Sequence, residues 1–592
     1  MKRIKVYIVC LAVAAMGFTA CNDEAMDLYP ETRITVPAFF KTTDDLKTYV
    51  NGLYNDGTLL SAGVWADAVS DNLTVVTAYP EQAWSIIHGT LSPETAGGWA
   101  GWGSLRSVNL LLNNLHDVTG TESEIRNYIG IARYMRAWFY FNKVAVYSDV
   151  PWYNKPLETD DPDVYKASDP RALVVDSIMA DLEYAVANIS ADMGNKTRVH
   201  KYCALALLSR FSLYEGTYRK YHPELNLAST AERFLQRAVS AGEEMMNSGQ
   251  FEITGGGTIL DLGNGIRGSQ GFRDLFCALD LSGNREIIQW VHYQYPNRVF
   301  HSGIGFWGLS RSLQESFLTA DGSPFSSVAG YDRKTFVDVF VDRDPRMAES
   351  ISYPGMTDLN NNITYSRPDR GGYDQSKSAT RPPMISGEYG ATQLYRYAEV
   401  LLNYAEAKAE LGSLTQADID KSINPLRDRV DMPHFDAAKE VDNDLRAQYP
   451  GITDNTLLAV RRERRVELAC EGFRERDLYR WGAGKLFLSP QSLQGMYVEL
   501  GLYDVTGDGI NDYAILEKEE DRNQYSEEEQ EPIKGWYYLA GGELNFTKVT
   551  ETSGYIIGDK SARDFKEPQY YYQPIPSVQL ILNPNLKQPY GW

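Results

Sequence analysis

The sequence predicts a mainly α-helical fold, in which helical hairpins form a scaffold for long irregular loops. Three observations support this prediction. Apolar residues recur at helical spacing in many segments, these segments follow one another over much of the chain, and some are joined by brief loops. The 592 residues are 43% apolar and 23% charged, an ordinary globular composition that can form a large core. Such hairpins indicate a tetratricopeptide-like stack, although a strict period of about 34 residues cannot be traced.

The helical pattern is clearest over residues 394–411. Its apolar residues fall on one face of a helix: Leu394, Tyr397, Ala398, Leu401, Leu402 and Ala405. Gly412 follows as a stop signal, because glycine tolerates the left-handed conformation found at helix ends. Similar patterns predict further helices, in chain order, over 43–55, 103–116, 124–147, 170–189, 197–219, 228–248, 312–319 and 456–471.

Long tracts rich in Gly, Pro, Asn and aromatic residues separate these helices. They cover residues 60–100, 250–310, 320–393 and 489–580. Loops of this length in an ordered protein are more often functional than idle. We therefore expect the ligand contacts to lie in these tracts, which we read as irregular.

The first twenty residues read as a signal peptide. A basic start, an apolar stretch and two small residues precede a cysteine: Lys2, Arg3 and Lys5, then 6–18, then Thr19, Ala20 and Cys21. The stretch is shorter than the roughly 20 residues of a membrane-spanning helix. Small residues before a cysteine form the bacterial lipoprotein box, so we expect lipidation of Cys21; a plain secretory signal is the alternative. We expect residues 21–592 to form a single domain.

The charge of the chain excludes some classes of partner. Its 79 Asp and Glu against 58 Lys and Arg give a net charge of -21, whereas nucleic-acid binding needs a basic surface. Removal of residues 1–20 takes away three positive charges and leaves a charge of -24 on the mature chain. The cysteines beyond Cys21 are Cys203, Cys277 and Cys470, too widely spaced for a disulfide framework, and we expect them to be buried thiols.

Two runs of residues resemble the signatures of a known family. Residues 395–407 read Tyr-Arg-Tyr-Ala-Glu-Val-Leu-Leu-Asn-Tyr-Ala-Glu-Ala, and residues 462–482 contain Arg-Glu-Arg-Arg-Val-Glu-Leu, Glu-Gly-Phe-Arg and Asp-Leu-Tyr-Arg-Trp-Gly. Both are similar to the SusD/RagB family of nutrient-binding outer-membrane lipoproteins. Further resemblances follow the family's order at 27–31, 136–141, 149–151, 343–346, 575–576 and 583–585, so the match spans nearly the whole chain.

The resemblance implies a function as well as a fold. It implies a glycan- or peptide-binding lipoprotein that caps a SusC-like TonB-dependent transporter, with four tetratricopeptide-type helix pairs supporting a loop-rich binding region. The N-terminal part would cover about 21–230 and the C-terminal part about 270–592. Asp23 and Glu24 behind Cys21 resemble the acidic signal that sends such lipoproteins to the cell surface. We therefore expect surface display at the outer membrane.

Aromatic residues in two of the long tracts are the candidate ligand contacts. Sugars present apolar C–H faces that stack on aromatic rings, while polar side chains hydrogen-bond their hydroxyl groups. The family places ligand residues in the corresponding regions, so the candidates are Tyr79, Trp84, Trp290, Tyr293, Tyr295 and Trp307, with Asp71 and Asn72 as hydroxyl partners. Tyr293 and Tyr295 alternate with Trp290 as in a strand, so some of these rings must face the core. Asp71 and Asn72 could instead cap a helix. A neutral oligosaccharide is favoured over a peptide or an acidic glycan.

One acidic loop has the spacing of a calcium site. Oxygen ligands would come from Asp504, Thr506, Asp508, the Ile510 carbonyl and Asp512, with Gly509 permitting the turn. The glutamate that closes an EF-hand is missing, because position 12 is Ile515. The alternative is a turn in which the Asp side chains hydrogen-bond their own backbone. A bound Ca²⁺ would stiffen the loop.

Catalytic signatures are absent from the sequence. The seven histidines form no HExxH motif, and neither a GxSxG motif nor a complete phosphate-binding loop occurs. The helical spacing of Glu463 and Glu467 predicts structural ion pairs, for which we expect Arg474, Arg476 and Asp477 as partners. We therefore predict a binding protein and no enzyme, with a surface glycan hydrolase as the alternative.

Overall fold

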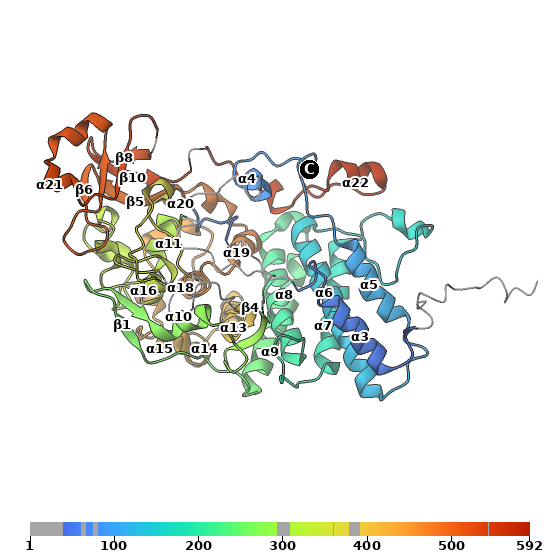
Figure 1. Cartoon of the computed structure of the whole chain (residues 1–592). Helices are drawn as coiled ribbons and strands as arrows, with labels where there is room; N and C mark the ends of the chain where they lie inside the picture. Colours follow the sequence, from blue (N-terminus) through green and yellow to red (C-terminus); the bar gives the residue numbers. More distant parts are fainter. Residues whose placement is uncertain are drawn as a thin grey trace, which may run out of the picture.

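The computed structural model describes residues 39–60, 67–74, 81–292, 308–358, 360–377, 391–542, 544–559 and 561–592. These residues form a mainly helical body with two three-stranded sheets at one end (Figure 1), which confirms the predicted fold class. Among the helices of these residues, none is both long and apolar enough to cross a membrane.

The N-terminal part is a stack of antiparallel helices that agrees with the predicted segments to within a few residues. The helices are α3 (Thr43–Leu53), α5 (Trp102–Asn113), α6 (Glu122–Tyr147), α7 (Arg171–Asn188), α8 (Lys201–Tyr221) and α9 (Ala231–Asn247). α6 packs against α7, α7 against α8, and α8 against α9. The long helix α6 begins at a capping box, in which the Thr121 hydroxyl accepts from the Glu124 amide at 3.3 Å.

The helix α13 (Tyr397–Glu410) continues the stack against α8 and α9. The prediction that it begins at Leu394 is wrong, because Leu394 belongs to strand β4 (Ala391–Arg396), which pairs antiparallel with β3 (Ile287–His292). Pairing with a strand about 100 residues away outweighs the local helical pattern. The predicted stop is confirmed, since Gly412 has a φ of 65°.

Shorter helices build the remainder of the body. They are α4 (Glu81–Ile87), α10 (Gln270–Cys277), α11 (Arg311–Ser316), α12 (Arg346–Ser350), α14 (Gln416–Ser422), α15 (Asn424–Asp428), α16 (Ala437–Glu440), α17 (Asn443–Gln448), α18 (Asn455–Glu467), α19 (Arg474–Arg480), α20 (Pro490–Leu493), α21 (Glu527–Gln530) and α22 (Ser577–Leu582). α18 lies against α13 and so joins this region to the helix stack.

The tract 489–580 was predicted to be irregular, but it contains two small sheets. Their strands are β5 (Gln494–Glu499), β6 (Gly501–Tyr503), β7 (Tyr513–Leu516), β8 (Gly535–Tyr538), β9 (Asn545–Lys548) and β10 (Ser553–Ile557). The orders are β5-β10-β9 and β6-β7-β8, with only β7 and β8 parallel among these pairs. A further hairpin joins β1 (Ile259–Asp261) to β2 (Arg267–Ser269). Strands of so few residues are too short for an alternating pattern to stand out in the sequence.

Two large hydrophobic cores hold the body together. The first extends from Phe40 to Leu586 and so draws on both the N-terminal and the C-terminal parts that the sequence predicts. The second lies beneath the small sheets and includes Leu73, Leu309 and Met496. The three cysteines beyond Cys21 are all buried, which confirms that prediction.

Candidate functional site

The two tracts that carry the predicted ligand aromatics meet at one place, which we call the loop junction (Asn72–Thr74, Gly308–Ser310 and Tyr373–Asp374). Leu73 forms an antiparallel bridge with Leu309, and the Thr74 amide donates to the Gly308 carbonyl at 3.0 Å. The Leu309 amide in turn donates to the Tyr373 carbonyl at 2.6 Å. Thr74 precedes the segment that contains Tyr79, and Gly308 directly follows Trp307. The backbone therefore brings the ends of both candidate segments together.

Trp84, one of the predicted aromatic platforms, is partly exposed in the structure. It lies on α4, and its indole stacks on the ring of His88 with centroids 3.7 Å apart and planes 27° apart. A helix places residues four apart on the same face, which explains the stack. A ring supported on one face and partly exposed is suited to stack on a sugar.

A buried chain of polar contacts supports this stack. His88 Nε2 lies 2.8 Å from Asp559 Oδ2, and Asp559 lies 3.4 Å from Arg563 Nε. Arg563 Nη2 donates to the carbonyls of Leu73 and Thr74 at 2.9 and 2.8 Å. The sequence analysis missed His88, Asp559 and Arg563. The spacing of four residues between Trp84 and His88 was the available signal, whereas Asp559 lies 471 residues beyond His88.

The prediction that Asp71 and Asn72 bind ligand hydroxyls is wrong. Both side chains are fully buried. Arg474 Nε and Nη2 donate to the two oxygens of Asp71 at 2.6 and 2.8 Å, and Arg465 Nε donates to Asn72 Oδ1 at 2.9 Å. Burial opposes the charge of Asp71, but Arg465 and Arg474 lower its pKa to about 2. These residues hold the loop junction onto α18 and α19 from beneath.

Trp290 is also removed from the set of ligand contacts. Its side chain is only 4% exposed and packs with Phe272 and Ile287 in a separate small core. This burial assigns the indole to the core beneath β3. Tyr79, Tyr293, Tyr295 and Trp307, together with Cys21, lie outside the described residues.

The acidic loop adopts the turn that the sequence left as the alternative to a calcium site. Asp504 Oδ2 accepts from the Gly509 amide at 2.7 Å, and Asp508 Oδ1 accepts from the Ile510 amide at 2.9 Å. Asp512 Oδ2 accepts from the Thr506 amide at 3.1 Å. Within the described ranges, no three His, Cys, Asp or Glu side chains are grouped so that they could hold a metal ion. Calcium binding by this loop stays a prediction.

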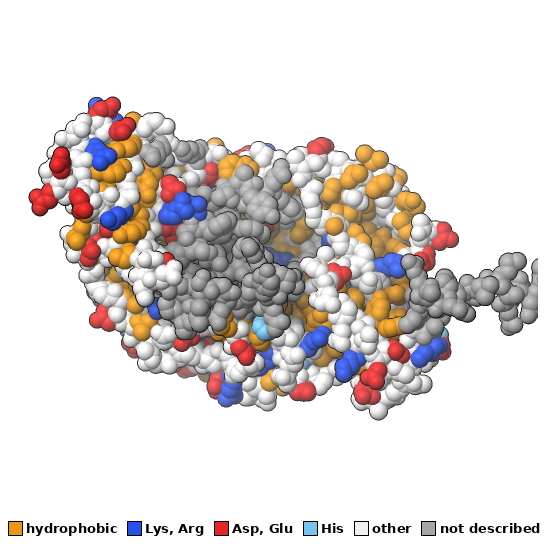
Figure 2. Space-filling model, viewed as in Figure 1, with side chains coloured by type: hydrophobic (Ala, Val, Ile, Leu, Met, Phe, Trp, Pro, Cys, Tyr) orange, Lys and Arg blue, Asp and Glu red, His pale blue; other side chains and the backbone are white. Residues whose placement is uncertain are grey.

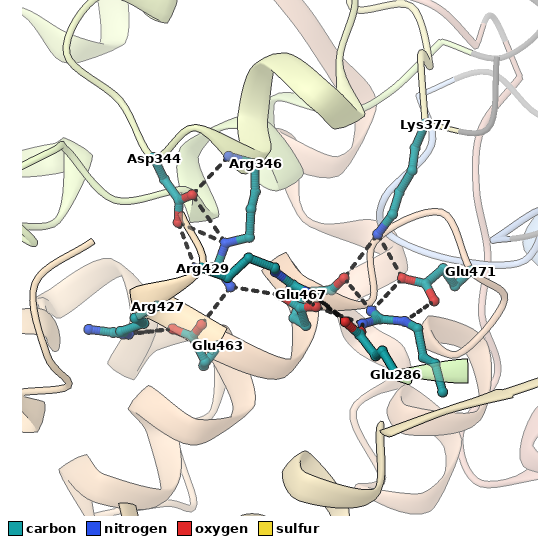
Figure 3. A network of polar contacts seen from close by, with 10 residues as sticks. Glu286, Asp344, Arg346, Lys377, Arg427, Arg429, Glu463, Glu467 and Glu471 are labelled. Carbon is teal, nitrogen blue, oxygen red and sulfur yellow. Dashed lines mark hydrogen bonds and ion pairs between the residues drawn. The ribbon is translucent and has the colours of Figure 1, made fainter. Parts of the chain in front are cut away.

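Glu463 and Glu467 form ion pairs deep in the protein, as predicted (Figure 3). Both are at most 2% exposed. Glu463 accepts from Arg346 and Arg427 at 2.7 and 2.6 Å. The guanidinium groups that contact Glu467 belong to Arg346, Arg396 and Arg429. Burial opposes the charge of Glu463, but Arg346 and Arg427 lower its pKa to about 2.

The predicted partners of these two glutamates are wrong. Arg474 pairs with Asp71, Arg476 Nη2 donates to Asn142, and Asp477 accepts from Arg464 at 2.8 Å. The true partners of Glu463 and Glu467 lie 36 to 121 residues away in the chain, beyond the reach of a helical wheel. The network also binds Lys377, whose Nζ donates to the Glu467 carbonyl at 2.9 Å. We assign these charges to the support of the fold, because every one of them has a charged partner within the protein.

Comparisons with family models and with known proteins agree on one family. Residues 280–592 match the SusD family, and residues 94–213 match a family described as starch-binding and associating with the outer membrane. A SusD-like protein of Formosa agariphila is 23% identical over 518 residues, which cover 81% of this chain and 92% of the relative.

Solved structures share the fold. A SusD-like carbohydrate-binding protein from Bacteroides fragilis superposes with a TM-score of 0.66 at 21% identity, covering 93% of this chain and 100% of that chain. A laminarin-binding SusD-like protein superposes with a TM-score of 0.54 at 19% identity, with 93% and 100% covered. The motif residues Arg346, Arg396 and Glu467 meet in the core, and the SusD match alone covers more than half of the sequence. From these findings together we conclude that the chain belongs to the SusD family.

Proposed function

We propose that this protein binds a neutral oligosaccharide at the cell surface and passes it to a SusC-like TonB-dependent transporter, without catalysing a reaction. The observation that carries the proposal is the partly exposed indole of Trp84, stacked on His88 and tied through Asp559 and Arg563 to the loop junction. A flat ring on a rigid support is the group that a sugar face needs. The carbohydrate-binding relative from Bacteroides fragilis and the laminarin-binding relative support this class of ligand.

A binding screen of residues 22–592 against neutral and acidic glycans and peptides tests the proposal. We expect saturable binding of a neutral oligosaccharide and no released product. The Trp84→Ala variant should weaken this binding by roughly tenfold, about 1.4 kcal/mol, because the stacking surface is lost. Trp536→Ala is the matched control, since Trp536 is also partly exposed but lies on β8 and stacks with Arg522.

The outcomes of the screen separate the alternatives. Binding of peptides alone would favour a peptide receptor, and release of shortened glycans would show a hydrolase. Equal loss of affinity in Trp84→Ala and Trp536→Ala would exclude Trp84 as the specific platform.

We further propose lipidation at Cys21 and a place at the outer membrane, with the transporter as partner. Support for a protein partner comes from α22, which exposes Val578, Ile581 and Leu582 by 55%, 80% and 62%. Hydrophobic side chains gather on this part of the surface in Figure 2. Exposed apolar patches mark interaction sites on soluble proteins. Copurification of the full-length protein with a large β-barrel from detergent-solubilised outer membranes is the expected result.

Calcium binding by the loop 504–512 is a separate proposal. Asp504 and Asp512 both accept from the Thr506 amide, at 3.1 Å each, so their carboxylates lie close together. We expect calorimetry to detect Ca²⁺ binding that Asp504→Asn abolishes, with a raised melting temperature in the presence of Ca²⁺. Glu551→Gln, at a side chain that is 98% exposed, is the control and should bind as the wild type does. Absence of a calcium-dependent heat in the wild type would leave the loop as a hydrogen-bonded turn.

A further inference from the structure

The support beneath Trp84 has an unusual chemistry, because both nitrogens of His88 face hydrogen-bond acceptors. Nδ1 lies 2.8 Å from the Trp84 carbonyl oxygen, and Nε2 lies 2.8 Å from Asp559 Oδ2. A carbonyl only accepts hydrogen bonds, and so does an ionised carboxylate. Nδ1 therefore donates to the Trp84 carbonyl, and the imidazole ring is held at both of its nitrogens.

Asp559 is in turn held in place by contacts with neighbouring residues. Arg563 lies 3.4 Å from Asp559 Oδ2, while the Ser561 amide donates to Oδ1 at 2.9 Å. The side chains of His88, Asp559 and Arg563 are only 4%, 2% and 1% exposed. Buried charges of this kind persist only when they are paired and hydrogen-bonded.

The same contacts join the platform to the loop junction. Arg563 Nη2 reaches the carbonyls of Leu73 and Thr74, at the point where Leu73 bridges Leu309. The Asp564 amide donates to the Ile87 carbonyl at 2.9 Å and thereby fixes the end of α4. One segment, residues 559–564, thus holds both the platform helix and the junction.

We propose that His88 and Asp559 are positioning residues for ligand binding: His88, held between Asp559 and the Trp84 carbonyl, fixes the indole of Trp84, and Arg563 couples this platform to the loop junction. The inference rests on the proposed function of Trp84 as a ligand contact. A ring fixed before binding loses less conformational entropy on binding. Ligand affinity should therefore fall when the contact between His88 and Asp559 is lost.

Other charged groups near α4 are placed differently. Lys566 Nζ donates to the Gly89 carbonyl at 3.1 Å, and its side chain is 48% exposed. The side chain of Asp564 is 60% exposed. Solvent screens both groups, so Asp559 and Arg563 dominate the environment of His88.

The first experiment needs no ligand. Acrylamide quenching of Trp84 fluorescence is obtained as the difference between each protein and the same protein with Trp84→Phe. We expect quenching to increase in Asp559→Asn, because the ring that supports the indole is no longer held. Asp564→Asn is the control and should keep the quenching of the wild type. Quenching in Asp559→Asn equal to that of the wild type would overturn the proposal.

The second experiment measures affinity, with laminarihexaose as the first probe. Asp559→Asn should weaken binding by about tenfold, as Trp84→Ala does. Asp564→Asn, which changes a neighbouring exposed carboxylate, should stay within about twofold of the wild type. If Trp84→Ala loses affinity but Asp559→Asn keeps the affinity of the wild type, the positioning role fails.

The two experiments separate failure of this inference from failure of the proposed function. Unchanged binding in Trp84→Ala would remove the platform from the ligand site, and with it the positioning role. If laminarihexaose does not bind, the quenching results decide whether His88 fixes Trp84. His88→Gln breaks the same contact from the other side and provides the test if Asp559→Asn does not fold.

Discussion

At pH 8, Asp374→Asn is expected to raise the free energy of unfolding by about 4 kcal/mol more than it does at pH 4. Asp374 lies at the loop junction, its side chain is buried, and neither carboxylate oxygen has a hydrogen-bond partner within the described part of the chain. Burial raises its pKa to about 7, although Arg367 and Arg370 act in the opposite direction. The difference between a pKa of about 7 in the folded protein and about 4 in the unfolded chain corresponds to about 4 kcal/mol.

The direction of this effect follows from proton binding. The folded protein holds a proton on Asp374 up to about pH 7, whereas the unfolded chain releases it near pH 4. The wild type therefore loses stability as the pH rises from about 4 to 7, and the loss is constant above that range. Asparagine has a similar size and no charge, so the variant should escape this loss.

Urea denaturation of both proteins at pH 4, 6 and 8 measures the difference. Asp428→Asn serves as the control, because its side chain is 62% exposed and its substitution should change stability by less than about 0.5 kcal/mol at each pH. If the free energy of unfolding gained by Asp374→Asn does not vary with pH, then Asp374 does not take up a proton on folding.

The second large effect is expected for Glu467→Gln, which should destabilise the protein by about 3–5 kcal/mol. Glu467 is fully buried and faces Arg346, Arg396 and Arg429, with the Arg396 contact at 2.7 Å and the Arg346 contact at 3.0 Å. Glutamine keeps the shape but removes the negative charge. Three buried guanidinium groups would then share too little opposite charge, and burial of uncompensated charge is costly.

The stability that Glu467 contributes should also depend on pH. It is lost as the pH falls, whereas Asp374 lowers the stability as the pH rises. Burial alone would raise the pKa of Glu467, but Arg429, Arg396 and Arg346 hold it well below its ordinary value. The stability from this group is therefore fully present above about pH 4.3, the unfolded value, and is lost as the pH falls further. Glu467→Gln should lose less stability on acidification than the wild type.

Chemical denaturation at pH 7 and pH 3 tests this prediction. Glu122→Gln is the matched control, since Glu122 forms an ion pair with Arg126 at the surface and its side chain is 79% exposed. Such pairs contribute less than about 1 kcal/mol. A loss of stability in Glu467→Gln no larger than in Glu122→Gln would show that the buried network is close to neutral for stability.

Local patterns in the sequence predicted the helices well but missed where some of them begin. The stripe from Leu394 to Ala405 is compatible with one helix, yet residues 391–396 pair with β3 instead. The short strands between residues 494 and 557 were missed for a related reason. Their pairing partners lie in other segments, and the strands themselves carry too few residues to show a period.

The sequence could not predict which candidate residues are exposed. Trp84 lies partly exposed, whereas Trp290, Asp71 and Asn72 are buried. Residue type alone does not separate an aromatic platform from an aromatic core residue. For Asp71 the deciding contact is Arg474, which lies 403 residues away, and no local pattern reports it.

By itself, the sequence determined the helical class, the order of the family's motifs and the kind of residue that a sugar site needs, because periodicity and motif spacing are local properties. The tertiary structure alone decided which charges pair in the core, which aromatic side chains face outward, and that His88, Asp559 and Arg563 support Trp84. These outcomes depend on contacts between residues hundreds of positions apart. Burial and pairing are set by how the helices and loops pack, and only the folded chain makes that packing visible.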